Sequence, residues 1–319
     1  MAVTSMSQSS IRNFDKRNTV RSPIIILGAQ EEALIGGYQY YLFTQSGALT
    51  IVQGSISAEI LCVGAGGSGG RNVGGGGGGG AIEGAGPGYY ATQVLTAGVA
   101  WGLEVGSGAG DQTASGGGGA GGATKFYGTS TITALGGGAG GVANSAGGDG
   151  GSGGGAASVN TATFSGGAAF GSNTNVGGDV VASTTWYMGG GGGGATAAGG
   201  TALTNRAGVG GEGLALTTID ANLTAANFSA FTGMTVIGSG GGGSNTRATS
   251  GTLDPGGAGG TGGGTGGAGS ASISDFTTST AGTSYGSGGG GGCWTGAGTA
   301  ASVTGRTGYQ GLVIVRYAV

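Results

Sequence analysis

The sequence predicts an all-β protein in which a small antiparallel β-sheet or sandwich is the nucleus for packed glycine-rich polyproline-II strands joined by long loops. Three observations support this fold class. Glycine supplies 90 of the 319 residues, compared with about 7% in an average protein. The glycines are gathered in tracts, of which residues 74–80 form the longest. Two segments that are apolar on both faces, residues 58–63 and 311–317, stand near the two ends of the glycine-rich region.

The segment at residues 58–63 has the pattern of a strand buried inside a sheet. In an extended chain Ile60 and Cys62 point to one side, whereas Leu61 and Val63 point to the other. Both faces are therefore expected to be covered. Residues 311–317, GLVIVRY, show the same pattern, and we expect them in the same sheet, where they would join the two ends of the domain.

The glycine tracts admit three interpretations. Collagen requires glycine at every third position and abundant proline, whereas this chain has three prolines and no long triplet repeat. Disordered low-complexity chains are usually highly charged and poor in apolar residues, but here 7% of residues are charged and 37% are hydrophobic. The third interpretation, ordered polyproline-II chains, is the one we adopt, because chains without Cβ atoms can approach closely enough to bond through their main chains.

The free energy gained by hydrogen bonding in such a lattice barely offsets the cost of ordering its chains. Ordering a residue costs about 1–2 kcal/mol, while a backbone hydrogen bond returns about 0.5–1.5 kcal/mol net. The lattice should therefore need an apolar β nucleus, and neighbouring chains as well. We expect a homotrimer, because contacts between copies can bury the additional apolar surface that a small core does not provide.

Further elements are predicted from turn signals along the chain. Residues 38–64 should form three extended pieces that end in the core strand. Two more segments, 89–95 and 99–105, should pair across a turn at residues 96–98, and residues 124–135 form a hairpin candidate around Gly128. Residues 23–27 suit a short strand or hydrophobic plug, and residues 30–35 are the one place where a helical turn is expected.

Residues 1–36 are predicted to form a basic N-terminal arm ahead of a glycine-rich domain over residues 37–319. Asp15 is the only acid among the first thirty residues, although the whole chain has a net charge of -3. The basic residues of the arm are Arg12, Lys16, Arg17 and Arg21. Such an arm could bind nucleic acid, dock onto a larger assembly or simply be solvated. With Phe14 as the one nearby aromatic, the nucleic-acid signal is weak, and we expect docking and no nucleic-acid partner.

The order of these segments resembles the glycine-rich domain of tail-fibre and adhesin proteins of tailed bacteriophages. The resemblance covers residues 38–319, and the end strands are its most specific part. The resemblance begins with an F-T-x-S-G segment at residues 43–47 and a strand that runs into glycines at residues 60–67. Two strand-containing segments follow at residues 89–110 and 124–140, and a terminal G-x-V-I-V-R-Y lies at residues 311–317.

The resemblance implies a virion protein, made in the host cytoplasm, that is often trimeric and touches the host surface with loops between its glycine tracts. The short arm would correspond to a virion-anchoring segment that binds other tail or baseplate proteins. The host partner would be a cell-surface glycan or an outer-membrane protein, with no membrane insertion. The alternative is a non-enzymatic capsid decoration or head-fibre protein with the same domain, and a secreted structural or ice-binding protein is a third class.

Aromatic residues inside the polar inserts are the candidate receptor contacts: Trp186, Tyr187, Tyr285 and Trp294. Trp and Tyr concentrate binding energy and stack on sugar rings. The alternative for Trp186 and Trp294 is that they cap the glycine bundle and shield its backbone bonds from water. Trp101 lies in a predicted strand and is expected in the core.

No constellation for catalysis is recognisable. The chain has no histidine, the commonest general base and metal ligand. From Glu59 onward its acids are scattered singly, and glycine tracts satisfy nucleotide-binding templates by composition alone. Cys62 and Cys293 stand in no metal-type spacing and are expected to be buried thiols without a disulfide. We therefore predict a protein that is not an enzyme and has no metal or cofactor.

Overall fold

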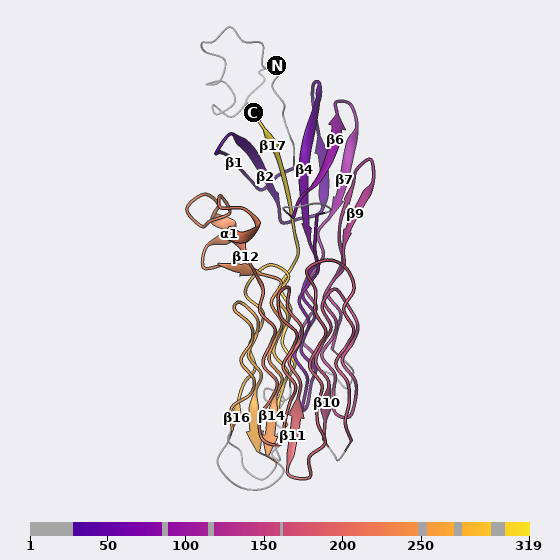
Figure 1. Cartoon of the computed structure of the whole chain (residues 1–319), viewed down its shortest axis with the longest axis vertical. Coiled ribbons are helices and arrows are strands. Elements are labelled where there is room, and N and C mark those ends of the chain that lie inside the picture. The colour runs from indigo at the N-terminus through magenta and orange to yellow at the C-terminus, as the bar shows by residue number, and fades with distance from the viewer. Residues whose placement is uncertain are drawn as a thin grey trace, which may run out of the picture.

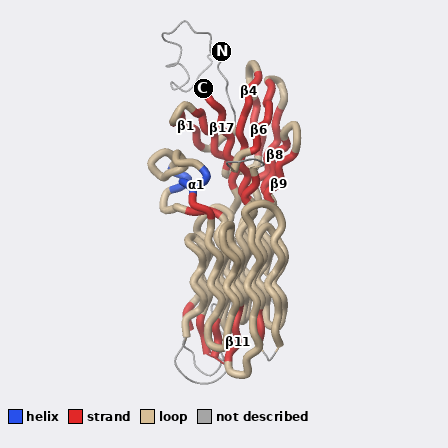
Figure 2. The backbone as a smooth tube through the Cα atoms, viewed as in Figure 1, coloured by secondary structure: helices blue, strands red, loops and turns tan. Residues whose placement is uncertain are grey.

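The computed structural model describes residues 28–84, 89–113, 118–159, 162–247, 254–270, 276–294 and 304–319. The molecule is elongated, with a β-sandwich at one end, a bundle of extended chains in the middle and a small sheet at the other end (Figures 1 and 2). We call these the sandwich end, the glycine bundle and the distal end. The basic arm and the segment at residues 23–27 lie outside the described residues.

The first sheet of the sandwich is built around the last strand of the chain. Its order is β1-β2-β17-β4-β5, and β6 also pairs with β4. In β17, Leu312 is opposite Val63 of β4, and Ile314 is opposite Leu42 of β2. The predicted joining of the two apolar strands in one sheet is therefore confirmed. The strands are β1 (Glu31–Ile35), β2 (Tyr38–Phe43), β4 (Ser55–Val63), β5 (Ile82–Glu83), β6 (Ala91–Thr96) and β17 (Leu312–Ala318).

The second sheet has the order β3-β7-β8-β9. Its strands are β3 (Gly47–Thr50), β7 (Ala100–Glu104), β8 (Thr124–Tyr127) and β9 (Thr131–Ala134). The hairpin predicted at residues 124–135 is confirmed. The pairing predicted between residues 89–95 and 99–105 is wrong, because β6 pairs with β4 in the first sheet, whereas β7 pairs with β3 and β8 in the second. The turn between them carries the chain from one sheet to the other.

The helical turn predicted at residues 30–35 is also wrong, since β1 is a strand whose side chains alternate in exposure. The reason lies in the two glycines that follow. Gly36 and Gly37 have φ of +60° and +82°, the left-handed values that a two-residue β-hairpin turn requires. They place Ile35 opposite Tyr38, and the resulting hairpin fixes β1 as an edge strand beside β2.

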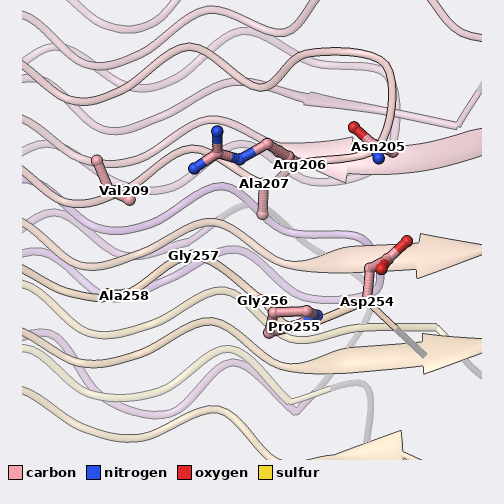
Figure 3. Close-up of a pocket in the computed structure, with 9 residues that line it drawn as sticks. All are labelled: Asn205, Arg206, Ala207, Val209, Asp254, Pro255, Gly256, Gly257 and Ala258. Carbon is pink, nitrogen blue, oxygen red and sulfur yellow. The ribbon is translucent and has the colours of Figure 1, made fainter.

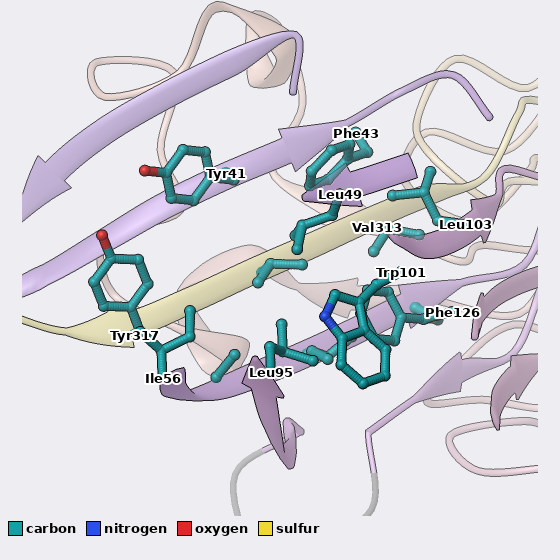
Figure 4. Close-up of a cluster of buried hydrophobic side chains, with 14 of the residues drawn as sticks. Tyr41, Phe43, Leu49, Ile56, Leu95, Trp101, Leu103, Phe126, Val313 and Tyr317 are labelled. Carbon is teal, nitrogen blue, oxygen red and sulfur yellow. The ribbon is translucent and has the colours of Figure 1, made fainter. Parts of the chain in front are cut away.

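Alternation along β4 distributes its side chains between two cores, as predicted. Ile60 and Cys62 belong to the core between the two sheets, where Trp101 is 9% exposed and packs with Leu95 and Phe126 (Figure 4). Leu61 and Val63 face the other side and belong to a second core. The expectation that Trp101 is a core residue is confirmed.

The second core is covered by an insert at residues 214–237. It contains β12 (Leu214–Ala215), the helix α1 (Leu216–Ile219), a 3-10 helix (Ser229–Phe231) and β13 (Val236–Ile237). Phe231 contacts Tyr285, with ring centroids 6.1 Å apart, and Tyr285 contacts Tyr309 at 5.5 Å. Tyr285 is 5% exposed and is therefore a core residue of the sandwich end.

The glycine bundle is held together by main-chain hydrogen bonds that repeat every three residues. Along residues 74–81 the N–H groups donate in turn to three different chains, at residues 286–292, 135–141 and 190–193. For example, Gly74, Gly77 and Gly80 donate to Gly292, Gly289 and Gly286, at 2.8, 2.9 and 2.7 Å. A three-residue repeat is the one expected of polyproline-II chains.

The carbonyl groups of the same tract face three further chains. Carbonyls at residues 74–81 accept hydrogen bonds from residues 64–70, 152–155 and 241–244. The central tract therefore has six chain neighbours, three that accept from it and three that donate to it. Its backbone polar groups are satisfied by other segments of the same chain, although no side chain takes part in these bonds.

Glycine is required in this packing because neighbouring backbones occupy the space of a Cβ atom. A Cβ on Gly76 would lie 1.9 Å from the carbonyl oxygen of Gly241, and one on Gly75 would lie 2.0 Å from that of Gly155. Such approaches are far inside van der Waals contact, and rigid backbone on both sides leaves no room to adjust.

The distal end carries a sheet with the order β10-β11-β14-β15-β16. Its strands are β10 (Ala157–Ser158), β11 (Trp186–Gly189), β14 (Asn245–Arg247), β15 (Ala268–Ser270) and β16 (Phe276–Thr277). The pairing of β14 with β15 is parallel and the others are antiparallel. The protein is therefore nearly all β, as the sequence predicts, with polyglycine chains between two sets of strands.

The substitution Gly76→Ala is expected to destabilise the protein by about 1–3 kcal/mol, because overpacking of rigid structure costs free energy of this size. The matched control is Gly110→Ala, since a Cβ at Gly110 would meet nothing within 4 Å. Denaturant unfolding of the two variants and the wild type measures the difference. Equal stability of the two variants would show that close backbone approach does not hold the bundle together.

Burial of Tyr285, followed by the nearby Tyr309 and Glu31, raises its pKa to about 12. Because the folded value exceeds the ordinary value of about 10, the protonated phenol stabilises the fold below pH 10. This contribution is lost as the pH rises from 10 to 12. Between pH 9 and pH 11, the free energy of unfolding of the wild type should therefore fall by about 1 kcal/mol more than that of Tyr285→Phe.

Thermal unfolding at the two pH values measures this difference. Tyr127→Phe, from a side chain that is 40% exposed, is the control and is expected to follow the wild type. If Tyr285→Phe also follows the wild type, ionisation of Tyr285 does not contribute to alkaline unfolding.

Candidate functional site

The centre of the distal end is a turn at residues 71–73, which connects the tract at 64–70 to the tract at 74–80. The first bonds after this turn show what surrounds it. Gly74 donates to Gly292 at 2.8 Å and accepts from Ser244 at 2.9 Å. Two residues beyond each of these partners are Trp294 and Thr246, so both residues lie just past the layer of Gly74, on segments that are hydrogen-bonded to it.

Three of the four predicted aromatic residues lie at this end, and two of them are in contact. Trp186 and Tyr187 are in β11, and the ring of Tyr187 lies 5.7 Å from that of Trp294. Thr246 connects them, since it is opposite Tyr187 in the β11–β14 ladder and its Oγ1 accepts a hydrogen bond from the Trp294 N–H at 3.0 Å. All three aromatic side chains are partly exposed, as a binding surface requires.

Trp186 lies on the other face of β11, since successive side chains of a strand alternate. It is opposite Arg247 of β14, whose guanidinium carbon is 5.3 Å from the centre of its ring. Trp186 also packs against a small buried cluster that includes Val180 and Met188. It therefore covers the end of the bundle, which is the capping role considered from the sequence.

Tyr285, the fourth predicted contact, is at the opposite end of the molecule in the core described above. At 5% exposure it does not suit a receptor contact, and we leave it out of the candidate site. The four basic residues proposed as virion anchors, Arg12, Lys16, Arg17 and Arg21, lie outside the described residues.

The sequence did not identify the arginines of the distal end. Of the basic side chains in the described parts of the chain, three form ion pairs away from the distal sheet: Lys125 with Glu104, Arg306 with Asp111, and Arg316 with Glu59 and Asp220. The other three are Arg71 in the central turn, Arg247 in β14 and Arg206 in a turn at residues 203–206. They form no ion pair within the described structure, and all three lie at the distal end.

Buried polar atoms without a hydrogen-bond partner are concentrated in the same place. Among the described residues, six side-chain atoms of this kind are found, and only Trp101 Nε1 belongs to the sandwich end. The other five are Arg71 Nε, Asn72 Oδ1, Ser244 Oγ, Asn245 Oδ1 and Arg247 Nε. Such groups cost free energy, and a native structure retains few of them, often where function requires it.

A groove of about 320 Å³ lies beside this centre, between residues 205–209 and 254–258 (Figure 3). Arg206 and Asp254 supply its charges, and Val209 and Pro255 supply apolar surface. Asn245 of β14 donates from Nδ2 to the carbonyl oxygen of Asn205 at 3.0 Å. The groove is thereby connected to the distal sheet.

The scattered acids of the bundle have structural partners. Asp149 accepts from the N–H of Ala168 at 2.7 Å, and Asp179 accepts from that of Gly166 at 2.9 Å. Within the described ranges, no group of three or more His, Cys, Asp or Glu side chains could hold a metal ion. No helix among those residues is long and apolar enough to cross a membrane.

The two thiols are buried and form no disulfide, as predicted. Burial raises the pKa of Cys293 to about 12 and places that of Cys62 well above its ordinary value. Neither thiol is therefore a nucleophile at neutral pH.

Comparison with known proteins identifies the family to which the chain belongs. No curated protein matches it significantly. The sequence profile of a family described as a glycine-rich domain matches residues 44–318, which extend from the sandwich end through the whole glycine bundle and back. The chain therefore belongs to this glycine-rich domain family.

Proposed function

We propose that the protein is a virion component of the tail-fibre or adhesin type, which anchors at its sandwich end and contacts the host cell surface with its distal end. The observation that carries this proposal is the collection of Tyr187, Trp294, Arg71 and Arg247 at one end of a long bundle. Tyrosine, tryptophan and arginine are the residue types in which binding energy is concentrated at protein interfaces.

The glycine bundle suits such a role because it is a stiff support. Each interior tract is bonded to several others, so bending one chain would break bonds to its neighbours. Turns and short strands held by a rigid scaffold are favoured places for binding residues. No chemistry is proposed for the site, which binds and does not catalyse.

The position of the chain ends supports the proposed direction of anchoring. Gln30 donates from Nε2 to the carbonyl oxygen of Gly28, the first described residue, at 2.8 Å. Val319, the last residue, donates its N–H to Gly37 at 3.0 Å. Both therefore lie at the sandwich end (Figure 1). The arm that carries Arg12 to Arg21 enters the fold there, and we propose that it binds tail or baseplate proteins.

We propose in addition that the protein is a homotrimer in the virion. Outer tracts of the bundle expose apolar side chains that no described segment covers. Val176, Val181 and Val209 are 51%, 41% and 50% exposed, and the chains that carry them are neighbours of the tract at residues 198–203. A second and a third copy would remove this surface from water.

The host-binding proposal is tested with labelled full-length protein and a panel of Gram-negative bacterial strains. The wild type is expected to bind some strains and not others. The double variant Tyr187→Ala, Trp294→Ala should lower binding to those strains at least tenfold, because aromatic contacts carry several kcal/mol at binding surfaces. Flow cytometry measures the bound protein.

The control is Val94→Ala, which removes a side chain 55% exposed at the sandwich end and should bind like the wild type. Absence of binding to every strain, or equal loss in the control, would contradict the proposed function. It would favour a capsid decoration that needs no receptor.

A further inference from the structure

We propose that the glycine bundle has a docking site for one extended segment of a partner protein, beside residues 135–141. The site is an open position in the packing of the tracts, flanked by residues 118–123 on one side and 145–151 on the other. The partner segment adopts the polyproline-II conformation, with glycine where it meets the bundle and small side chains elsewhere. This inference is independent of the proposed host contact, because it concerns the side of the bundle and not its distal end.

The open position follows from the neighbours of residues 135–141. The central tract at residues 74–80 has six neighbours, whereas residues 135–141 have five within the described structure. These five form a row in which each tract is bonded to the next: residues 118–122, 64–70, 74–80, 152–155 and 145–151. The first and last tracts of the row are not bonded to each other. Since six tracts surround a fully packed one, the position between these two ends is left open.

The main-chain donors of residues 135–141 show the same open side. Two of every three N–H groups bond to a neighbouring tract, at residues 137, 138, 140 and 141. The remaining ones, at Gly136 and Ala139, meet no acceptor among the described residues. Both residues are partly exposed, whereas residues 137, 138 and 140 are buried. Two free donors three residues apart match the carbonyl spacing of one added polyproline-II chain.

The flanking tracts supply acceptors for the same chain. No described group donates to the carbonyl oxygens of Ala120 and Gly121 on one flank, or to those of Ala146 and Asp149 on the other. An added chain would therefore accept from residues 135–141 and donate to both flanks. Main-chain bonding of this kind is how an exposed sheet edge captures an extended peptide.

Another outer tract shows which sequences suit such a position. Residues 198–202 have three neighbouring tracts, as the added segment would. Gly199 is required there, since a Cβ would lie 2.0 Å from the carbonyl oxygen of Gly191. Ala198 and Thr201, in contrast, are exposed. The partner segment therefore needs glycine only where it contacts the bundle, and it can carry Ala, Ser or Thr where it faces water.

A second copy of this protein is the other occupant to consider. The exposed valines that a contact between bundles would cover lie on residues 175–181 and 206–213, which are not neighbours of residues 135–141. Apart from Leu135 at one end, the exposed side chains beside the open position are small or charged: Ala120, Ala146 and Asp149. Burying a carboxylate between two bundles costs free energy, whereas a single segment covers little more than the main chain between the flanks.

Amide hydrogen exchange of the full-length protein, followed by NMR, tests whether the position is open. Without a partner, the amides of Gly136 and Ala139 are expected to exchange at least tenfold faster than those of Gly138 and Gly140, because unbonded amides are not protected. Slow exchange of both at every protein concentration would show that this chain fills the position itself. Exchange that slows as the protein concentration rises would show that a second copy fills it. Either result would overturn the inference.

The probe for the partner is a capped peptide with the sequence of residues 196–202, TAAGGTA. In excess, it should slow exchange at Gly136 and Ala139 at least fivefold, because binding protects the two amides. Exchange at Thr201, whose exposed N–H also meets no described acceptor, should not change. The matched peptide TAAVVTA should have no effect, since its side chains would meet rigid backbone. The inference fails if TAAGGTA protects neither amide, if both peptides act equally, or if Thr201 is protected to the same extent.

Ala139→Pro removes one of the two free donors without breaking a bond of the fold. Proline suits the polyproline-II conformation and lacks the N–H that points to the open position. The variant should unfold at the same temperature as the wild type, while TAAGGTA no longer protects Gly136. Thr201→Pro, which removes an unbonded N–H from another tract, is the matched control and should leave that protection unchanged. Full protection of Gly136 in folded Ala139→Pro would show that the peptide binds elsewhere.

Discussion

The structure depends on direct hydrogen bonding between backbones that carry no side chains. In an ordinary sheet a strand bonds two neighbours and uses its faces for side-chain packing, whereas the tract at residues 74–80 bonds six neighbours and has no faces. The interior of the bundle is therefore made of peptide groups instead of hydrocarbon. Its cohesion is directional, and a shift of one tract by one residue would misplace the donors and acceptors of all its neighbours.

That requirement explains why the sandwich is needed. A glycine tract has no side chain that distinguishes one register from another, so the register must be set outside the tract. β4 and β17 do this by burying alternating side chains in two cores, and β4 continues directly into the tract at residues 64–70. The partly buried network of Arg316 with Glu59 and Asp220 connects the same strands to the insert that contains α1.

Features that depend on the pattern of large side chains could be predicted from the sequence. Features that depend on which segments pair with the glycine tracts could not. The two faces of β4, its sheet with β17 and the buried position of Trp101 all follow from side-chain alternation. The separation of β6 from β7 does not, because pairing partners leave no local pattern. Trp186 and Tyr285 both precede a glycine tract, but the two tracts run in opposite directions, so the residues lie at opposite ends. Arg71 and Arg247 could be identified only once the chains around them were known.

The central turn at residues 71–73 has a consequence for how such a protein can diversify. The chains around the central tract come from widely separated parts of the sequence, and each reverses direction or leaves the bundle near the same spot. New residues in any one of these connections would alter the surroundings of Arg71 while every main-chain bond of the shaft stayed in place. The connections can therefore change in sequence and length independently of the main-chain bonding of the bundle, so the surface of the distal end can diversify while the architecture is kept.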